Sequence, residues 1–239
     1  MNLILFDAPQ AELLLPHDDP RALHLRNVLR RQAGDQFDAA AVNGPRGKGT
    51  LLAIEPDGLR LAFHWSQNAE DDRLPIHLLL GLPRPQTARK VLEQTAAQGV
   101  RSITFFEAEK GEPSYAQSRL WSTDEWSRLL RRGVEQAFCA FLPEVFHHPN
   151  LPSALAAVQP KGNRLALDVY EADQPLAPPD SPELEESITL ALGPERGWSL
   201  AERNHLRAAR FTLQHLGTRV LRTETACIAA LGILAVPHW

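Results

Sequence analysis

The chain has 239 residues, of which 44% are apolar and 23% are charged, and its formal net charge at pH 7 is −4. This balance is typical of a globular protein of one or two domains and excludes a disordered or fibrous chain. The negative charge argues against a protein that coats nucleic acid non-specifically, because such binding needs many Lys and Arg, but it is compatible with a local basic face.

The first residues predict a strand rather than a targeting segment. Residues 1–7 lack the basic start and the long apolar core of a signal peptide. The longest apolar run, 226–236, ends at Pro237 and is much shorter than the ~18 residues that a membrane span requires. We therefore expect a cytoplasmic protein with no membrane partner.

Residues 1–72 are expected to form a small β-barrel domain. A helix is predicted over 20–31, capped by Asp18 or Asp19 and ending before Gly34. The polar segment 66–75 has the composition of an inter-domain linker, so we divide the chain after residue 72. Strands separated by Gly, Pro and Asp turns are expected at 3–6, 37–42, 50–54 and 59–65.

Residues 73–239 alternate between predicted strands and helices. The expected strands are 76–81, 103–106, 144–146, 164–169, 188–192 and 218–221, and the expected helices are 86–98, 124–138, one from 153, 199–213 and 223–234. This alternation predicts an α/β domain with a mostly parallel sheet and helices on both faces. Ligands in that architecture bind at the carboxyl ends of the strands. The Pro-rich segment 174–186 is expected to be an exposed loop.

Several common motifs are missing from this α/β pattern. The sequence has no Gly-rich dinucleotide fingerprint, no P-loop and no nucleophile elbow. The run 44–50 lies between two predicted strands and is expected to be a hairpin turn. His147 and His148 have no further His at ligand spacing, so no metal site is expected. Cys139 and Cys227 are expected to be small buried apolar side chains.

Two segments near the C-terminus are candidates for a functional site. The first, 190–202, runs from a strand through a Gly-Pro loop into a helix, where Ser199 and Glu202 form a capping box. The backbone amides of this loop would face a bound ligand. A tight strand-to-helix turn without a ligand is the alternative.

The second segment combines a short strand, two charges and a helix start. Arg222 and Glu224 follow the strand predicted at 218–221, and Thr223 is expected to cap the last helix. Charged side chains at the carboxyl end of a strand occupy the place where catalytic groups lie in α/β sheets.

These two segments resemble the motifs of the RsmE-type SPOUT methyltransferases. The first reads Gly-Pro-Glu-Arg-Gly-Trp-Ser-x-x-Glu from Gly193, and the second reads Leu-Gly-Thr-Arg-Val-Leu-Arg-Thr-Glu-Thr-Ala from Leu216. The resemblance covers the whole chain. It implies a PUA-like barrel followed by a trefoil-knotted α/β domain, in a homodimer that binds S-adenosylmethionine. It also implies methylation of N3 of a uridine in 16S ribosomal RNA, in the small ribosomal subunit.

The resemblance implies which residues hold the cofactor, with glycines where the backbone must approach it. The expected cofactor-binding residues are Leu167, Leu192, Gly193, Pro194, Gly197, Leu216, Gly217, Val220, Leu221, Thr225 and Ala226. On the last helix, the residues expected at the dimer interface are Thr225, Ala226, Ile228, Ala229, Gly232 and Ile233.

Arg222, Glu195 and Glu224 are the candidate catalytic residues. Arg222 would hold the uracil and stabilise its negative charge as the N3 proton leaves. Glu195 or Glu224 would accept that proton or orient a water molecule. For Glu224 the alternative is a first-turn acid that stabilises its helix through the helix dipole.

Arg26, Arg30 and Arg31 in the first domain and Arg84 in the second are expected to bind RNA. Arg26 and Arg30 are four residues apart, so they would share one face of the predicted helix. A solvated cationic face without an RNA partner is the alternative.

The chain departs from the family motifs at several positions. Arg196 stands where members have the first glycine of a Gly-Gly pair, Ala97 where they have Glu and Cys139 where they have Arg. Residues 2–5 lack the Arg that members commonly have near the start of the first strand. Two alternatives therefore stay open. One is a divergent enzyme that methylates another RNA position, and the other is a cofactor-binding dimer without turnover that serves as an RNA-binding or assembly module.

Overall fold

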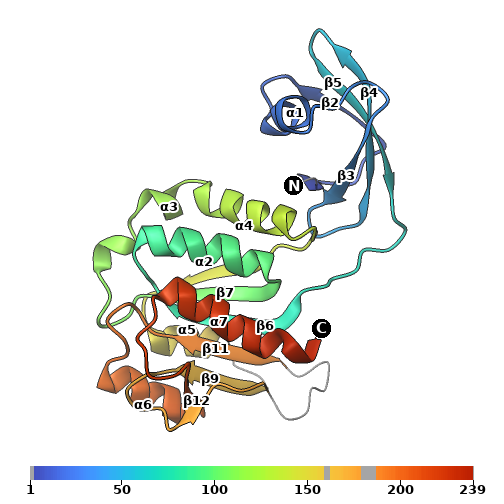
Figure 1. The fold of residues 1–239 in the computed structure, drawn as a ribbon. Coiled ribbons are helices and arrows are strands. Elements are labelled where there is room, and N and C mark those ends of the chain that lie inside the picture. Colours follow the sequence, from blue (N-terminus) through green and yellow to red (C-terminus); the bar gives the residue numbers. More distant parts are fainter. Residues whose placement is uncertain (1–2, 159–161, 179–186, 239) are drawn as a thin grey trace. The chain divides into compact units, whose positions relative to one another are not determined.

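A computed structural model describes residues 3–158, 162–178 and 187–238 (Figure 1). The chain divides into two compact units. One consists of Met1–Asp72 with Val134–Leu142, and the other of Arg73–Gly133 with Pro143–Trp239. The sequence division after residue 72 falls at one of these boundaries, but it assigns 134–142 to the second domain.

The first unit is built on a five-stranded sheet in the order β1-β3-β4-β5-β2. Its strands are β1 (Leu3–Phe6), β2 (Glu12–Pro16), β3 (Gln36–Ala41), β4 (Arg46–Glu55) and β5 (Gly58–Trp65). Alternate apolar side chains, such as Phe37 with Ala39 and Leu59 with Leu61, point into one core. Strand β2 is missing from the sequence prediction because its Leu13 to Leu15 run does not alternate and ends at a proline.

The hairpin between β3 and β4 turns earlier than predicted. Its turn lies at 42–45, where the Ala41 amide donates to the Pro45 carbonyl at 2.9 Å. The residues from Arg46 to Thr50, expected as part of the turn, belong to strand β4 and pair with β3.

The helix predicted over 20–31 is shorter and changes type. Helix α1 (Pro20–Leu23) begins at Asp19, whose carboxylate accepts from the Arg21 amide at 2.8 Å. A π-helical turn, His24–Val28, follows, and Arg30 then has a left-handed φ of 53°. Arg26 and Arg30 therefore do not share the face of one regular helix, and that prediction is wrong.

The segment Val134–Leu142 is held to the first unit by its backbone and by one carboxylate. The Leu5 amide donates to Glu135 Oε1 at 3.0 Å, and the Asn43 amide donates to the Ala140 carbonyl at 2.9 Å. The Leu142 amide donates to Asn43 Oδ1 at 2.8 Å. Local sequence patterns carry no signal for such a distant pairing.

The second unit contains a seven-stranded parallel sheet in the order β10-β12-β9-β11-β6-β7-β8. The strands are β6 (Leu74–Gly81), β7 (Val100–Phe106), β8 (Glu144–His148), β9 (Asn163–Leu167), β10 (Gln174–Pro175), β11 (Ile188–Leu192) and β12 (Thr212–His215). Every residue of β11 is buried, as expected for a central strand that is covered on both faces. The predicted α/β class is therefore confirmed.

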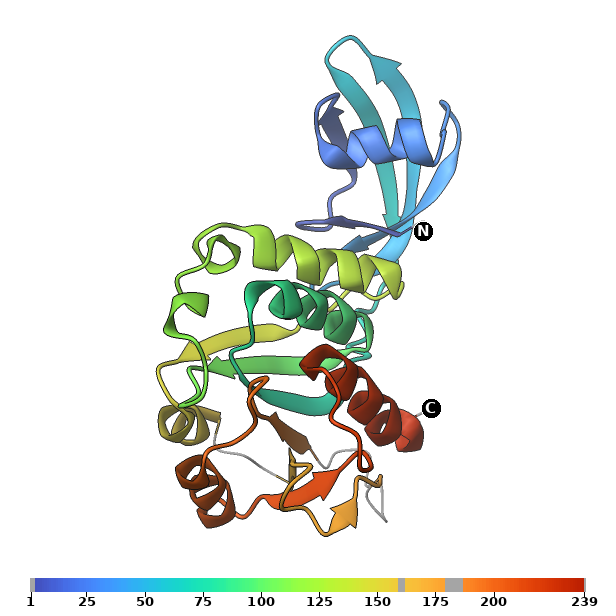
Figure 2. The ribbon, with the colours of Figure 1, turned by 60° about the vertical axis from the view of Figure 1, so that its left-hand side comes forward.

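Helices cover both faces of this sheet (Figures 1 and 2). They are α2 (Pro85–Ala97), α3 (Arg119–Ser122), α4 (Glu125–Gln136), α5 (Leu151–Val158), α6 (Leu200–Ala208) and α7 (Thr223–Ala235). Helices α2 and α7 pack together on one face. On the other face, the aligned Leu79, Ala191 and Ala166 share a core with Leu151 of α5 and Leu206 of α6.

The main error of the sequence prediction in this unit is the position at which helix α6 ends. The helix stops at Ala208, and Arg210 adopts a left-handed φ of 62°. The Phe211 amide then donates back to the Leu206 carbonyl at 2.9 Å. Because this helix end lacks the usual glycine, the sequence predicts a helix through 213 and misses strand β12.

The strand predicted at 218–221 is wrong, because these residues form a loop that leads from β12 to α7. Val220 is 71% exposed, so its apolar character does not reflect packing inside a sheet. In the segment 174–186, expected as a loop, Gln174–Pro175 pair with β12 as strand β10, and residues 179–186 lie outside the described part of the chain.

Candidate functional site

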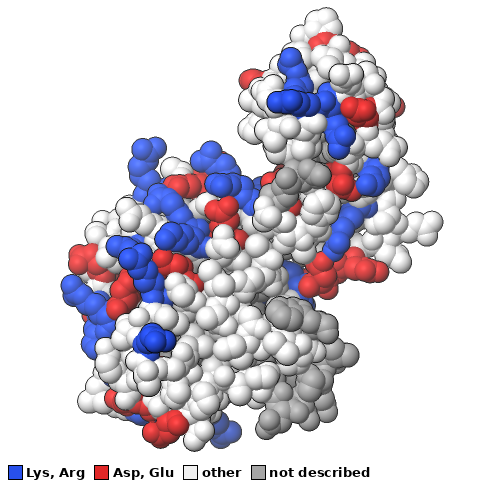
Figure 3. Space-filling view, viewed as in Figure 1, with Lys and Arg blue, Asp and Glu red and all other residues white. Residues whose placement is uncertain are grey.

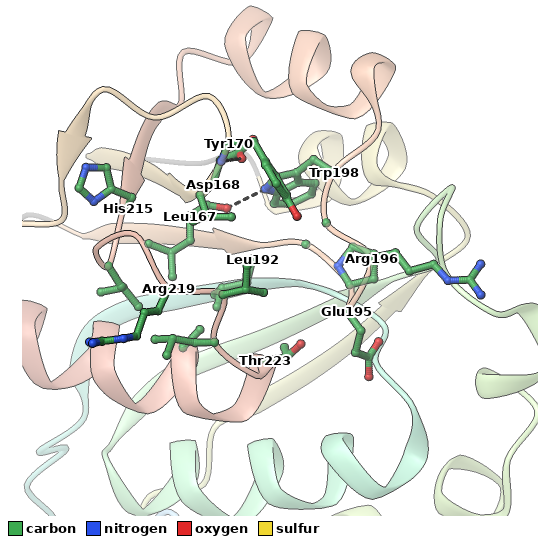
Figure 4. A pocket seen from close by; sticks show the side chains of 18 of the residues that line it. Leu167, Asp168, Tyr170, Leu192, Glu195, Arg196, Trp198, His215, Arg219 and Thr223 are labelled. Carbon is green, nitrogen blue, oxygen red and sulfur yellow. Dashed lines mark hydrogen bonds between the residues drawn. The ribbon is translucent and has the colours of Figure 1, made fainter.

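A cavity lies at the carboxyl ends of β9 and β11, under the loop that follows β12 (Figure 4). Three loops and the start of α7 form its walls. Its lining residues are Leu167, Asp168, Val169, Tyr170, Leu192, Gly193, Pro194, Glu195, Arg196, Gly197, Trp198, His215, Leu216, Gly217, Arg219, Val220, Leu221, Thr223 and Ala226. We call it the main cavity. It occupies the position where open α/β sheets bind their ligands.

Trp198 joins two of these loops. Its indole is 1% exposed, and Nε1 donates to the Leu167 carbonyl at 2.8 Å (Figure 4). The ring also stacks on Phe106, with ring centroids 6.0 Å apart. This single side chain therefore fixes the end of β9 relative to the loop between β11 and α6.

Glycines permit the close packing of that loop. A Cβ on Gly81 would lie 2.8 Å from Pro194 Cδ, so only glycine lets β6 approach the loop this closely. Gly197 has a φ of +68°, a conformation that other residues adopt at a cost in free energy. The predicted capping box of α6 is confirmed, because Ser199 and Glu202 exchange hydrogen bonds of 2.8 and 3.0 Å.

Asp168 forms a buried ion pair at the rim of the main cavity. Its carboxylate accepts from the Arg203 guanidinium and from the Tyr170 amide at 2.8 Å. The side chains of Asp168 and Arg203 are 1% and 11% exposed. Burial alone would raise the pKa of Asp168, but the hydrogen bonds outweigh it and hold the pKa below its ordinary value. Asp168 is therefore ionised at neutral pH.

The main cavity gathers ten of the eleven residues expected to bind a cofactor. The exception is Thr225, which is exposed on α7 and does not line the cavity. Side chains that the sequence interpretation missed include Asp168, Tyr170 and His215. The predicted strand 164–169 placed Asp168 inside the sheet, although the strand ends one residue before it.

A second cavity adjoins the main one and contains the three candidate catalytic residues. It is lined by Arg84, Thr87, Glu195, Val220, Leu221, Arg222, Thr223 and Glu224. The Arg84 amide donates to Glu195 Oε1 at 3.0 Å. Within the described residues, the Arg222 guanidinium makes no hydrogen bond or ion pair. We call this the side cavity.

Arg222 enters the side cavity from a helix start, not from a strand end. It occupies the N-cap position of α7, with φ −65° and ψ 149°, and its carbonyl accepts from the Ala226 amide at 2.8 Å. The expectations that a strand precedes Arg222 and that Thr223 caps the helix are therefore wrong.

Glu224 is held by a cation from the neighbouring helix. Its side chain is 10% exposed and accepts from Lys90 of α2 at 3.1 Å. Burial raises the pKa of Glu224, but its own backbone amide and Lys90 outweigh burial and lower the pKa below its ordinary value. A carboxylate in this state is a weak proton acceptor, so the contacts favour the first-turn structural role.

The candidate RNA-binding residues do not form one group. Arg84 lines the side cavity, whereas Arg26, Arg30 and Arg31 belong to the first unit. Arg26 and Arg30 are exposed, and Arg26 donates to His17 Nδ1 at 3.3 Å. In the described parts of the chain, no three His, Cys, Asp or Glu side chains are grouped to bind a metal ion. Across the same residues, every helix is too short or too polar to cross a membrane.

A parallel α/β sheet with a loop-built cavity at its carboxyl edge defines a ligand-binding domain of the kind found in enzymes. The family of RNA methyltransferase domains matches residues 70–235. The ribosomal RNA small subunit methyltransferase E of Treponema pallidum is 30% identical over 248 residues, which cover 100% of this chain and 92% of that protein. The chain therefore belongs to this family of RNA methyltransferases.

Two further relatives match along almost their whole length. Ribosomal RNA small subunit methyltransferase E 1 of Borreliella burgdorferi is 27% identical over 98% of both chains. The crystal structure of a ribosomal RNA small subunit methyltransferase E from Neisseria gonorrhoeae, bound to S-adenosyl methionine, superposes with a TM-score of 0.81. That likeness covers 99% of this chain and 98% of the other at 20% identity, so it establishes the shared fold.

Proposed function

We propose that the chain transfers the methyl group of S-adenosylmethionine to N3 of a uridine in 16S ribosomal RNA. The observation that carries this proposal is the junction of the two cavities. The main and side cavities share Glu195, Val220, Leu221 and Thr223, and the side cavity adds the cation of Arg222. A cofactor in one cavity and a base in the other would meet at this boundary. Membership in the RNA methyltransferase family supports the same reaction.

The main cavity fits S-adenosylmethionine by its chemistry. Leu192, Val220 and Leu221 offer apolar surface, and the Val220 side chain is 71% exposed. A Cβ built on Gly217 meets no atom within 4 Å, so this glycine keeps space open beside the cavity wall. When bound, the cofactor would supply an electrophilic methyl group on its sulfonium. We also propose that the loops around this cavity form the trefoil knot that the family resemblance implies.

Replacing Gly217 with valine is expected to lower the affinity for S-adenosylmethionine at least about ten-fold, because the new side chain would occupy that space. Gly217 has a φ of +96°, so the substitution also strains the backbone. Gly34 is a matched control in the first unit, since it has a φ of +95° and likewise no neighbour within 4 Å of a built Cβ. Calorimetry should show normal binding by Gly34→Val. Equal affinity in a folded Gly217→Val protein would contradict the placement of the cofactor.

The transfer requires a ring nitrogen that has lost its proton. In the proposed mechanism, the Arg222 cation stabilises the negative charge that develops on the uracil. Glu195 is exposed and its carboxylate is oriented by the Arg84 amide, so it is the better placed acceptor for the N3 proton. Glu224 holds α7 to α2 through Lys90 instead.

We also propose a homodimer formed through α7. The residues that this helix leaves uncovered are apolar or small: Thr225 and Ile228 are exposed, and Ala229, Gly232 and Ile233 are half-buried. A Cβ on Gly232 would meet nothing within 4 Å. Figure 3 shows an uncharged surface over this helix, unlike the side near α3 and α4, where Lys and Arg gather. An apolar helix face of this kind is suited to a partner helix.

Replacing Ile228 with glutamate is expected to produce a monomer, because the charge would be buried without a partner at the interface. Light scattering should then give the 26.6 kDa of one chain in place of twice that mass. Ile54→Glu is the control, since Ile54 is similarly exposed, at 51% against 38%, but lies on β4. An unmodified protein that is already a monomer at micromolar concentration would refute the dimer.

The first unit is proposed to dock on RNA as a PUA-like domain. Arg26, Arg30 and Arg31 lie close together in the chain around the end of the π-helical turn and would contact phosphates there. Because ribosomal RNA is the proposed substrate, the protein would act in the cytoplasm.

Nucleoside mass spectrometry of 16S ribosomal RNA from a strain that lacks this protein tests the proposed function. We expect N3-methyluridine to disappear and to return when the protein is supplied again. Loss of a different methylated nucleoside would identify a divergent enzyme. An unchanged set of nucleosides would favour the cofactor-binding dimer without turnover and would contradict the proposal.

A further inference from the structure

A second large cavity lies at the ends of β7 and β8, outside the main and side cavities. Its volume is about 510 Å³, within the ~300–1,000 Å³ range of ligand sites. The lining residues are Leu82, Phe106, Glu107, Ala116, Trp121, Trp126, Val145, His147, His148 and Pro149. We call it the aromatic cavity, because aromatic rings from β7, α3, α4 and β8 converge on it.

The His147 ring of the aromatic cavity packs against two other rings. His147 lies edge-on to Trp121, with ring centroids 4.2 Å apart, and stacks on Phe105 at 5.3 Å. Removal of water lowers the pKa of His147, with a smaller contribution from His148, so its ring is neutral at pH 7. The Trp121 indole N–H has no acceptor within the described residues. The cavity thus offers flat neutral rings, while the Trp121 N–H itself is buried.

A basic groove adjoins the side cavity, and one of its lining loops leads along the chain into the aromatic cavity. It is lined by Arg84, Lys110, Gly111, Glu112, Tyr115, Glu195 and Arg196. Glu195 and Arg84 also line the side cavity, while the loop that carries Lys110 and Tyr115 continues into Ala116 of the aromatic cavity. Figure 4 shows Arg196 extending away from Leu192 and Trp198. This arginine stands where the family motif has glycine, so the cation is a feature of this chain.

We propose that the aromatic cavity holds a second, unmodified nucleobase of the same RNA strand, while the sugar-phosphate backbone between the two bases lies along the groove of Arg84, Lys110 and Arg196. This inference rests on the proposed function. Stacking on aromatic rings is how proteins hold the bases of single strands, and the backbone needs cations. Three cations against two carboxylates, Glu112 and Glu195, leave the groove net positive. The cavity would thereby select the RNA segment around the target uridine.

The test uses full-length protein and a fluorescent single-stranded RNA of about 12 nucleotides, the scale of one single-strand site. Trp126→Leu keeps an apolar side chain but removes the ring, whereas Trp126→Phe keeps a ring. His147→Ala is the second cavity variant. Its matched control is Phe146→Ala, because Phe146 is the adjacent residue on β8, points to the opposite face and is 46% exposed.

We expect Trp126→Leu and His147→Ala each to raise the Kd for RNA about ten-fold, the scale of one lost base stack. Trp126→Phe and Phe146→Ala should bind like the unmodified protein. With small ribosomal subunits, the two cavity variants should raise KM while kcat and the affinity for S-adenosylmethionine stay unchanged.

The outcomes separate this inference from the proposed function. The unmodified protein could show no methyl transfer while the two cavity variants still bind RNA about ten-fold more weakly than the control variants. In that case the second base site stands and the proposed reaction fails. If methyl transfer occurs while the cavity variants match Phe146→Ala in both Kd and KM, the second base site is overturned. A change in molecular mass in Trp126→Leu, with unchanged RNA affinity, would assign the cavity to contacts between chains and would also overturn it.

Discussion

Replacing Arg222 with alanine is expected to lower the rate of methyl transfer about 10²–10³-fold, the effect of removing one preorganised electrostatic donor. Its guanidinium lines the side cavity but not the main cavity, so the affinity for S-adenosylmethionine should change little. Arg222→Lys keeps the positive charge and should recover part of the rate. Turnover with small ribosomal subunits and calorimetry with the cofactor measure the two effects separately.

A structural role for Arg222 makes a different prediction. If the guanidinium mainly formed an ion pair with Glu195 or Glu224, Arg222→Ala would lower thermal stability and cofactor affinity together. Glu224 is already paired with Lys90 at 3.1 Å, and Glu195 accepts from the Arg84 amide at 3.0 Å. We therefore expect unchanged stability. A stable Arg222→Ala protein with normal turnover would refute the catalytic role.

Replacing Asp168 with asparagine is expected to destabilise the fold by about 3–5 kcal/mol, because the buried Arg203 charge would lose its buried partner and keep only the more exposed Glu171. Glu171→Gln is the matched control. Glu171 also pairs with Arg203, at 3.4 Å, but its side chain is 36% exposed, so its loss should cost less than about 1 kcal/mol. Urea denaturation of the three proteins measures both differences. Equal urea midpoints for Asp168→Asn and Glu171→Gln would contradict the expectation that the buried ion pair stabilises the fold more than the exposed one.

The stability contributed by Asp168 should depend on pH. Its pKa is lower in the folded protein than in the unfolded chain, so the contribution is fully present above the unfolded value of about 3.9. It is lost as the pH falls through the folded pKa, where the carboxylate takes up a proton. The difference between the unmodified protein and Asp168→Asn should therefore shrink below about pH 4.

Sequence patterns predict the parts of this fold whose signals are local. The uniformly apolar 188–192 predicts the buried strand β11, and Ser199 with Glu202 predicts the start of α6. Strand β12 is missed because Arg210 ends α6 without a glycine. The docking of 134–142 on the first unit depends on contacts such as that of Glu135 with the Leu5 amide, which no local pattern encodes.

In the candidate site, too, the sequence predicts what lies within a local motif and misses what depends on contacts between distant segments. The two motifs locate most residues of the main cavity, because they supply two of its three loops. Asp168 and Tyr170 come from the third loop, whose closeness to the motifs arises only when β9 pairs with β11. Arg222 is identified as a site residue, but the predicted reason is wrong, since it begins a helix and does not end a strand. The roles of Arg222, Glu195 and Glu224 stay predictions.

The proposed reaction requires that this protein itself methylates N3 of a uridine in 16S ribosomal RNA. The most direct test incubates the purified protein and S-adenosylmethionine carrying an isotopically labelled methyl group with small ribosomal subunits from a strain that lacks the protein. The ribosomal RNA is then digested to nucleosides for mass spectrometry. The proposed reaction predicts labelled N3-methyluridine, formed by the unmodified protein and strongly reduced with Arg222→Ala. Label on any other nucleoside, or no label with a protein that binds the cofactor, would contradict it.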